Sequence, residues 1–316
     1  MTDDPRAMLA ALGLTTPRTP VTAQPLAGGW GGNRLWRVDL PGHPPLVLRA
    51  VPGSTGAGPR REAAIHAIVR IAGIPAPEIV AVGPVPGGSL AAMAMHLMPG
   101  IPLSQALLRA PDAATARSLG DAAGRMLARI HAIPASSLLT AGIWPGESGD
   151  SGSWLTWKPV PPTVQRIAEA ADTPAADWRL LHLDFHLENL LADPATGAIA
   201  AVLDWTNARL GPPEADLART RTVLETARLL PDLPPGAEAI LDAFTEGFVA
   251  GHAEVHGPAD PVRLRATTAW ALDAQIADLT PKLGTPGVSL TASMLARLRA
   301  ARDGAVAEAE RTSAQR

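Results

Sequence analysis

Short runs of alternating apolar and polar residues fill the first hundred positions of the chain. Trp36 and Val38 alternate with Arg37 and Asp39, the pattern of a strand with one buried face. Turn-forming Gly and Pro clusters separate these runs. The pattern predicts strands at 21–26, 34–40, 46–51, 79–82 and 90–98, with a helix at 59–72. Together these elements form a small antiparallel sheet with one helix.

Beyond Pro99-Gly100 the apolar residues follow helical spacing. A buried helix is marked by Leu119, Ala123, Met126, Leu127 and Ile130. After Asp216 the pattern is helical to the end, with breaks at 231–235, 256–261 and 281–286. We therefore predict an α+β fold in two lobes, with an N-terminal nucleotide-binding lobe at 1–98 and a mostly helical C-terminal catalytic and acceptor-binding lobe at 99–316.

The second lobe also contains a predicted hairpin. Leu190 and Leu191 begin it, the cluster 193–197 is its turn, and the apolar run 199–203 ends at Asp204. A loop that carries Asp184 precedes the first of these strands. One carboxylate is therefore expected at each end of the hairpin, Asp184 before its first strand and Asp204 after its second.

The polar residues around this hairpin have the spacing that phosphoryl-transfer enzymes of the kinase type use. Asp184 stands five positions before Asn189, and Asp204 follows about one hairpin later. Asp184 is predicted to accept the proton of an attacking hydroxyl. Magnesium prefers oxygen ligands, so Asn189 and Asp204 are predicted to hold the metal that neutralises the nucleotide phosphates.

Two alternatives stay open at this point. His182, Asp184 and His186 form an H-x-D-x-H pattern, whose alternate positions lie on one side of an extended segment and could bind a metal in a hydrolase. Zinc sites usually need further ligands, and the other histidines are scattered. The second alternative is a kinase-like protein that binds nucleotide without transferring phosphate.

Candidate nucleotide contacts occur in the first lobe. The cluster Gly28–Gly32 joins two strands, and Gly29, Gly31 and Gly32 would let backbone amides approach phosphates. Arg49, on a strand, and Glu62, on the inner face of the following helix, are expected to form the ion pair that positions phosphates in kinase-like lobes.

The end of the first lobe is the expected hinge. His96 and Met98 precede the Pro99-Gly100 break, where backbone groups could read the edge of an adenine. Both residues are therefore predicted to contact the nucleotide.

Composition limits the remaining possibilities. A net charge of −3 argues against a nucleic-acid binder, and the absence of cysteine excludes disulfides and a thiol nucleophile. No secretory signal or apolar run of membrane-spanning length is visible, so a cytoplasmic protein is expected. The richness in Ala, Pro and Gly with little Lys suggests a GC-rich bacterial genome.

Charge is distributed unevenly along the chain. From Asp177 onward there are 19 acids and 13 bases, which suits a cationic acceptor, although solvated helix faces could give the same excess. Trp144, Trp154 and Trp157 could stack on a sugar or a lactone, or pack within their own lobe.

With these motifs the chain resembles the aminoglycoside phosphotransferase family of kinase-like small-molecule phosphotransferases. The resemblance covers roughly residues 20 to 250. It rests on Leu26-Ala-Gly-Gly-Trp-Gly-Gly-Asn33, Leu46-Val-Leu-Arg49, Arg61-Glu62, His182-Leu-Asp-Phe-His-Leu-Glu-Asn189, Leu203-Asp-Trp-Thr-Asn207 and Gly211-Pro-Pro-Glu-Ala-Asp-Leu217.

The resemblance implies roles for individual residues. Asp184 looks like the catalytic base, and Asn189 and Asp204 look like magnesium ligands. Asp216 looks like a buried carboxylate that braces the catalytic loop, and His182 looks structural. Arg49 stands where many members have lysine.

The chain also departs from the family pattern. Leu183 replaces the usual small Gly, and Trp205 occupies the place of the Phe in protein kinases. No activation segment ending in Ala-Pro-Glu is present, so protein substrates are not expected.

The resulting prediction is an ATP- or GTP-dependent, Mg²⁺-dependent phosphotransferase that moves the γ-phosphoryl group to a hydroxyl of a small molecule. The sequence leaves open the acceptor (an aminoglycoside, macrolide, amino sugar, choline-like alcohol or other metabolite), the choice of ATP or GTP, any part in antibiotic resistance, the role of His186 and the oligomeric state.

Overall fold

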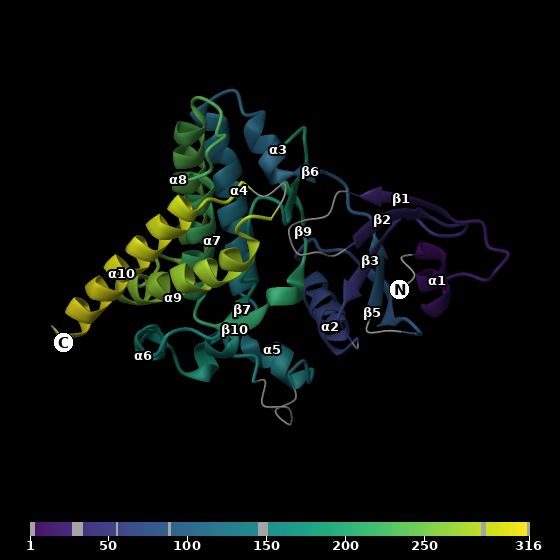
Figure 1. Cartoon of the computed structure of the whole chain (residues 1–316), viewed down its shortest axis with the longest axis horizontal. Coiled ribbons are helices and arrows are strands. Elements are labelled where there is room, and N and C mark those ends of the chain that lie inside the picture. Colours follow the sequence, from purple (N-terminus) through teal and green to yellow (C-terminus); the bar gives the residue numbers. More distant parts are fainter. Residues whose placement is uncertain are drawn as a thin grey trace. The chain divides into compact units, whose positions relative to one another are not determined.

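The computed structural model describes residues 4–26, 34–54, 56–87, 90–144, 151–285 and 289–314 (Figure 1). The chain divides into two compact units. Unit 1 comprises residues 1–100 and 200–206, and unit 2 comprises residues 101–199 and 207–316.

Unit 1 contains a five-stranded antiparallel sheet in the order β1-β2-β3-β5-β4. The predicted strands are confirmed, and a further short helix, α1, precedes them. The bounds are α1 Pro5–Ala11, β1 Thr22–Leu26, β2 Arg34–Asp39, β3 Leu46–Pro52, α2 Ala57–Ile71, β4 Ile79–Pro84 and β5 Leu90–His96.

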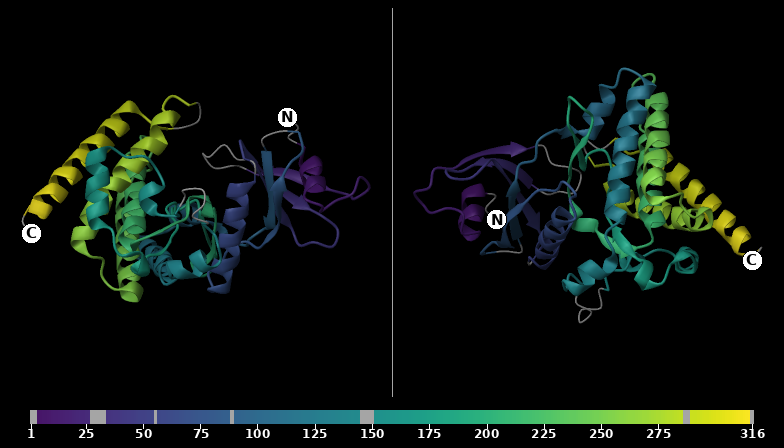
Figure 2. Two further views of the ribbon diagram at one scale, coloured as in Figure 1. Left: turned by 90° about the horizontal axis from the view of Figure 1, so that it is seen from below. Right: turned by 180° about the vertical axis from the view of Figure 1, so that it is seen from behind.

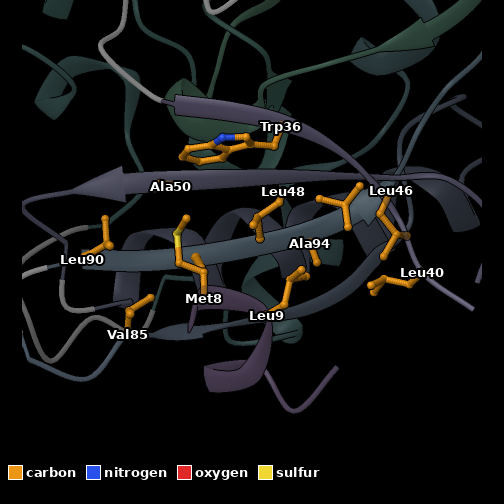
Figure 3. Packing of buried hydrophobic residues seen from close by; sticks show 12 residues of the cluster. Met8, Leu9, Trp36, Leu40, Leu46, Leu48, Ala50, Val85, Leu90 and Ala94 are labelled. Atoms are coloured by element: carbon orange, nitrogen blue, oxygen red, sulfur yellow. The ribbon is translucent and has the colours of Figure 1, made fainter. Parts of the chain in front are cut away.

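Helix α1 covers one face of this sheet. Asp4 caps the helix by accepting the N–H of Arg6, and Met8 and Leu9 are fully buried against the strands (Figure 3). Leu46 and Leu48 of β3 belong to the same cluster. Because side chains alternate along a strand, Arg49 must point to the opposite sheet face, where α2 packs.

The packing of α4 on α8 dominates unit 2. Glycines allow this close packing: Gly120 and Gly124 on α4 (Ala113–His131) meet the backbone of α8 (Ala237–His256). A Cβ on Gly124 would stand 2.1 Å from the carbonyl oxygen of Phe248. The two helix backbones are therefore in direct contact.

Three other long helices of unit 2 are α7 (Pro213–Ala227), α9 (Pro261–Leu279) and α10 (Ala292–Ala314). Helix α9 packs on both α7 and α10, and α10 lies beside it (Figure 2). Trp154 and Trp270 meet edge to face in the core beside α6 (Pro162–Ala171), with ring centroids 4.9 Å apart. Among the described helices, none combines the length and apolar character that a bilayer-crossing segment requires.

Short elements complete unit 2. They are β6 Ile101–Pro102, α3 Leu103–Leu108, α5 Ala135–Thr140, η2 Trp154–Thr156, η3 Ala175–Asp177, β7 Arg179–Leu181, β8 Leu190–Ala192, β10 Arg209–Gly211 and η5 Thr280–Lys282. β7 pairs with β10, and β8 pairs with β6. Strand β9 (Ile199–Val202) leads the chain into unit 1, where η4 (Trp205–Asn207) begins.

Candidate active site

The predicted catalytic loop lies between β7 and β8 in unit 2. Asn189 donates from Nδ2 to the main-chain oxygen of Asp184 at 2.9 Å and to its carboxylate at 3.2 Å. The amide oxygen of Asn189, the atom that a magnesium ion would need, takes no part in these two bonds. The loop therefore fixes Asp184 and Asn189 to one another, with about a fifth of the Asp184 side chain exposed, at 22%.

Asp216, at the start of α7, holds the beginning of this loop. Its fully buried carboxylate accepts the N–H of His182 at 2.6 Å and the N–H of Leu183 at 2.9 Å. Leu183 has a φ of +57°, a left-handed conformation that is unfavourable for a residue with a branched side chain. The two hydrogen bonds stabilise this conformation, which the usual Gly would adopt without strain.

A chain of imidazoles continues from Asp216 into the core. His131 Nε2 lies 3.2 Å from the Asp216 carboxylate, and His131 Nδ1 lies 2.9 Å from His252 Nε2. Burial alone would raise the pKa of Asp216, but the hydrogen bond and charge of His131 lower it overall. Burial, together with repulsion from His131, lowers the pKa of His252 to about 3. His252 is therefore a neutral core residue at ordinary pH.

The residues of the hydrolase alternative do not form a metal site among the described residues. Within the described ranges there is no group of three or more His, Asp or Glu side chains that could hold a metal ion. His182 is fully buried, packs edge-on against Phe185 and accepts the N–H of Asp184 at Nδ1. His186 is partly exposed, and its Nε2 lies 3.5 Å from the Asp184 carboxylate.

Unit 1 contains the predicted ion pair. Arg49 on β3 and Glu62 on α2 are in direct contact, and both are buried. Burial alone would raise the pKa of Glu62, but the charge of Arg49 lowers it to about 2. Arg49 Nε, although buried, has no hydrogen-bond partner among the described residues.

Asp204 belongs to unit 1 and lies beside this pair. Its carboxylate is 3.5 Å from Arg49 Nη1 and accepts the N–H of Thr206 at 3.3 Å. The Thr206 hydroxyl in turn donates to Glu62 at 3.0 Å. Asp204 has a φ of +56°, and its side chain is 35% exposed. A partly exposed carboxylate on a fixed backbone is a suitable ligand for magnesium.

The remaining predicted nucleotide contacts are the glycine cluster and the residues at the end of β5. Gly29, Gly31 and Gly32 lie outside the described residues. His96 ends β5, and its N–H is already bonded to the carbonyl oxygen of Glu78 at 2.9 Å. A backbone contact with a base would therefore use the carbonyl of His96 or the backbone of Met98.

A group of charged residues that the sequence did not predict lies in the same unit as Asp184. Lys158 follows η2, and Arg219 lies on α7. Both pair with Asp278 near the end of α9. Only the rarity of lysine in the chain could have drawn attention to Lys158, since these residues are far apart in sequence.

The chain resembles known proteins both in sequence and in fold. The sequence profile of the phosphotransferase enzyme family matches residues 22–257. A curated relative, acyl-CoA dehydrogenase family member 10 of Mus musculus, is 29% identical over 198 residues. That match covers 55% of this chain but only 18% of the mouse protein.

Two solved structures share the fold. A protein from Ralstonia eutropha JMP134, assigned as an aminoglycoside phosphotransferase, is 18% identical with a TM-score of 0.64, and the match covers 98% of each chain. Amicoumacin kinase hAmiN, in complex with AMP-PNP, Ca²⁺ and amicoumacin, is 15% identical with a TM-score of 0.61. That match covers 96% of this chain and 94% of the kinase.

These similarities confirm the predicted α+β protein kinase-like fold. The family profile alone spans most of the chain and includes the loop of Asp184 and Asn189, the Asp204 segment and the Arg49–Glu62 pair. The chain belongs to the phosphotransferase enzyme family.

Proposed function

We propose that this small-molecule phosphotransferase uses ATP or GTP with magnesium and transfers the γ-phosphoryl group to a hydroxyl of its acceptor. The observation that carries the proposal is the loop in which Asn189 is hydrogen-bonded to Asp184 through its amide nitrogen only. This arrangement presents a carboxylate for a hydroxyl proton and an amide oxygen for a metal. The AMP-PNP and Ca²⁺ bound to amicoumacin kinase support a nucleotide and a divalent cation.

In the proposed reaction, Asp184 accepts a hydrogen bond from the acceptor hydroxyl and orients its oxygen toward the γ-phosphorus. A bond forms between that oxygen and phosphorus while the bond to the bridging oxygen of the nucleoside diphosphate breaks. The hydroxyl proton passes to Asp184. His186, 3.5 Å from the same carboxylate, helps to position it.

The nucleotide phosphates are proposed to lie against Arg49, whose orientation the buried Glu62 fixes. Asn189 and Asp204 are the proposed magnesium ligands, since each has a carbonyl or carboxylate oxygen and is only partly buried. The metal would neutralise charge on the phosphates. We propose that Gly29, Gly31 and Gly32 approach the phosphates, and that the backbones of His96 and Met98 contact the base.

A screen tests this function directly. Hydroxylated compounds of different charge are incubated with ATP or GTP and Mg²⁺, and products are searched by mass spectrometry for the gain of one phosphoryl group. The matched control is Asp184→Asn, which keeps the shape of the side chain but is a far weaker base. Phosphorylated product with the wild type and its near absence with the variant support the proposal. Nucleotide hydrolysis without any phosphorylated acceptor would contradict it.

A further inference from the structure

Thr206 bonds to two residues from different parts of unit 1. Its main-chain N–H donates to the Asp204 carboxylate at 3.3 Å, and its hydroxyl donates to the Glu62 carboxylate at 3.0 Å. Asp204 follows β9, whereas Glu62 lies on α2, 144 positions before Thr206. Thr206 therefore connects the loop of a proposed magnesium ligand to the helix whose carboxylate contacts Arg49.

The hydroxyl of Thr206 binds a charged acceptor. Glu62 is ionised in the folded protein, because the charge of Arg49 outweighs the effect of burial and lowers the pKa of Glu62 to about 2. An ionised carboxylate only accepts hydrogen bonds, so the hydroxyl must be the donor. Arg49 and Thr206 both bind Oε2 of Glu62. Hydrogen bonds to a charged group are stronger than those between neutral groups, so this link holds Glu62 and Thr206 firmly together.

Arg49 closes these contacts into a ring. It contacts Glu62 directly, and its Nη1 lies 3.5 Å from Oδ1 of Asp204. The bond from the Thr206 N–H uses the same Oδ1, so the other oxygen of Asp204 takes no part in these two contacts. Asp204 is held at a φ of +56°, which its bond to a main-chain N–H two residues on helps to stabilise. The ring thus fixes Asp204 relative to Arg49.

We infer that Thr206 is a positioning residue, whose hydroxyl holds the Asp204 loop to Glu62 so that a magnesium ion on Asp204 is aligned with the phosphates on Arg49. The inference rests on the proposed function and adds to it a residue that binds neither the metal nor the phosphates. Threonine suits this role, because its branched side chain has few rotamers and its hydroxyl therefore loses little freedom in the bond.

The variant Thr206→Val removes the hydroxyl alone. Valine has nearly the same shape, and its main-chain N–H can still bind Asp204. Arg49 keeps its direct contact with Glu62 in this variant, so the binding of nucleotide without metal should change little. A magnesium ion, which must join Asp204 to the phosphates, should lose its alignment. Thr206→Ser restores a hydroxyl and should restore the effect of the metal.

Calorimetric titration tests this without turnover. AMP-PNP and GMP-PNP are titrated with and without Mg²⁺, and the tighter ligand of the wild type is used for the variants. We expect Thr206→Val to weaken binding at least about fivefold with Mg²⁺ and less than about twofold without it, and Thr206→Ser to regain most of the loss. The control is Thr16→Val, because Thr16 is also exposed in unit 1 and its hydroxyl bonds to that of Thr19 at 2.9 Å.

Turnover gives a second readout. Thr206→Val should raise KM for the nucleotide and leave KM for the acceptor unchanged, whereas a loss of stability alone would change neither. Addition of Thr206→Val to Glu62→Gln should weaken binding with Mg²⁺ by less than about twofold, since the hydroxyl then has no charged acceptor.

Three results would contradict these expectations. A further loss of about fivefold in the double variant would mean that the hydroxyl acts on the metal or the phosphates directly, and would overturn the inference. A wild-type response to Mg²⁺ in Thr206→Val would overturn it as well, and would leave the proposed function standing. If Mg²⁺ does not raise the nucleotide affinity of the wild type, the proposed function fails, and the inference with it.

Discussion

The carboxylate of Asp216 accepts the main-chain N–H of Leu183 at 2.9 Å, and Leu183 is held at a φ of +57°. A left-handed conformation costs a residue such as leucine about 1–2 kcal/mol. The conformation persists because Asp216 binds two successive N–H groups, while the Leu183 side chain is completely buried. The start of the Asp184 loop is therefore determined by a residue that touches no substrate.

Replacement of Asp216 by asparagine should disturb this loop. The amide has one acceptor oxygen for two N–H donors, so one donor is left buried without a partner, which costs about 1–3 kcal/mol. We expect lower stability in urea and a fall in kcat. Asp193→Asn is the control, because Asp193 also accepts two N–H groups, at Ala195 and Thr196, but in an exposed turn. Equal effects of the two variants would contradict the role given to Asp216.

The contact of α4 with α8 should not tolerate a methyl group. In Gly124→Ala the new Cβ would meet the Phe248 carbonyl oxygen, so the helices must separate, at a cost of about 1–3 kcal/mol or more. Gly304 on α10 has no heavy atom within 4 Å of such a Cβ. Gly304→Ala should therefore stabilise the protein by about 0.5–1 kcal/mol. Thermal unfolding of the two variants measures this opposite response.

The Arg49–Glu62 pair should make stability depend on acidic pH. The pKa of Glu62 falls from an ordinary value of 4.5 to about 2 in the folded protein. Its contribution is therefore complete above pH 4.5 and is lost as the pH falls toward 2. Glu62→Gln leaves the buried Arg49 with the more distant Asp204 as its remaining carboxylate partner, and we expect a loss of about 3 kcal/mol at neutral pH. Urea unfolding between pH 7 and 3 should show a weaker pH dependence for the variant than for the wild type.

Asp204 should determine how strongly Mg²⁺ raises the affinity for nucleotide. Removal of this carboxylate in Asp204→Ala should abolish the gain in nucleotide affinity that Mg²⁺ gives, and reduce kcat by on the order of 100-fold. Asp39→Ala is a suitable control, since Asp39 is a carboxylate at the end of β2 in the same unit. Calorimetric titration of nucleotide with and without Mg²⁺ measures the effect. If Mg²⁺ raises the nucleotide affinity of Asp204→Ala as much as that of the wild type, Asp204 is not a magnesium ligand.

Local patterns were sufficient to predict much of the fold. Alternation along residues 34–40 and 46–51 indicated the strands, because one sheet face is covered by α1 and buries every second residue. The Arg49–Glu62 contact also followed from such patterns, as each residue lies on the inner side of its own element. These features depend on neighbours within a few positions.

Features that depend on contacts between residues far apart in the chain could not be predicted from the sequence. Segment 200–206 belongs with unit 1 through contacts such as the bond from the Val202 N–H to the Pro75 carbonyl. The Lys158–Asp278 contact joins residues 120 positions apart, and no periodicity marks either residue. The overall acid excess suggests a cationic acceptor, and this stays a prediction, because a sum of charges over the chain does not show which charges surround Asp184.

The proposed phosphoryl transfer is tested most directly by ³¹P NMR, which follows the fate of the γ-phosphoryl group. With Mg²⁺, ATP and an accepted hydroxyl compound, we expect a phosphomonoester resonance to grow in step with ADP. The rate should fall by about 10²–10⁴-fold in Asp184→Asn, with unfolding in urea unchanged. Release of inorganic phosphate alone, or ester formation by Asp184→Asn at the wild-type rate, would contradict it.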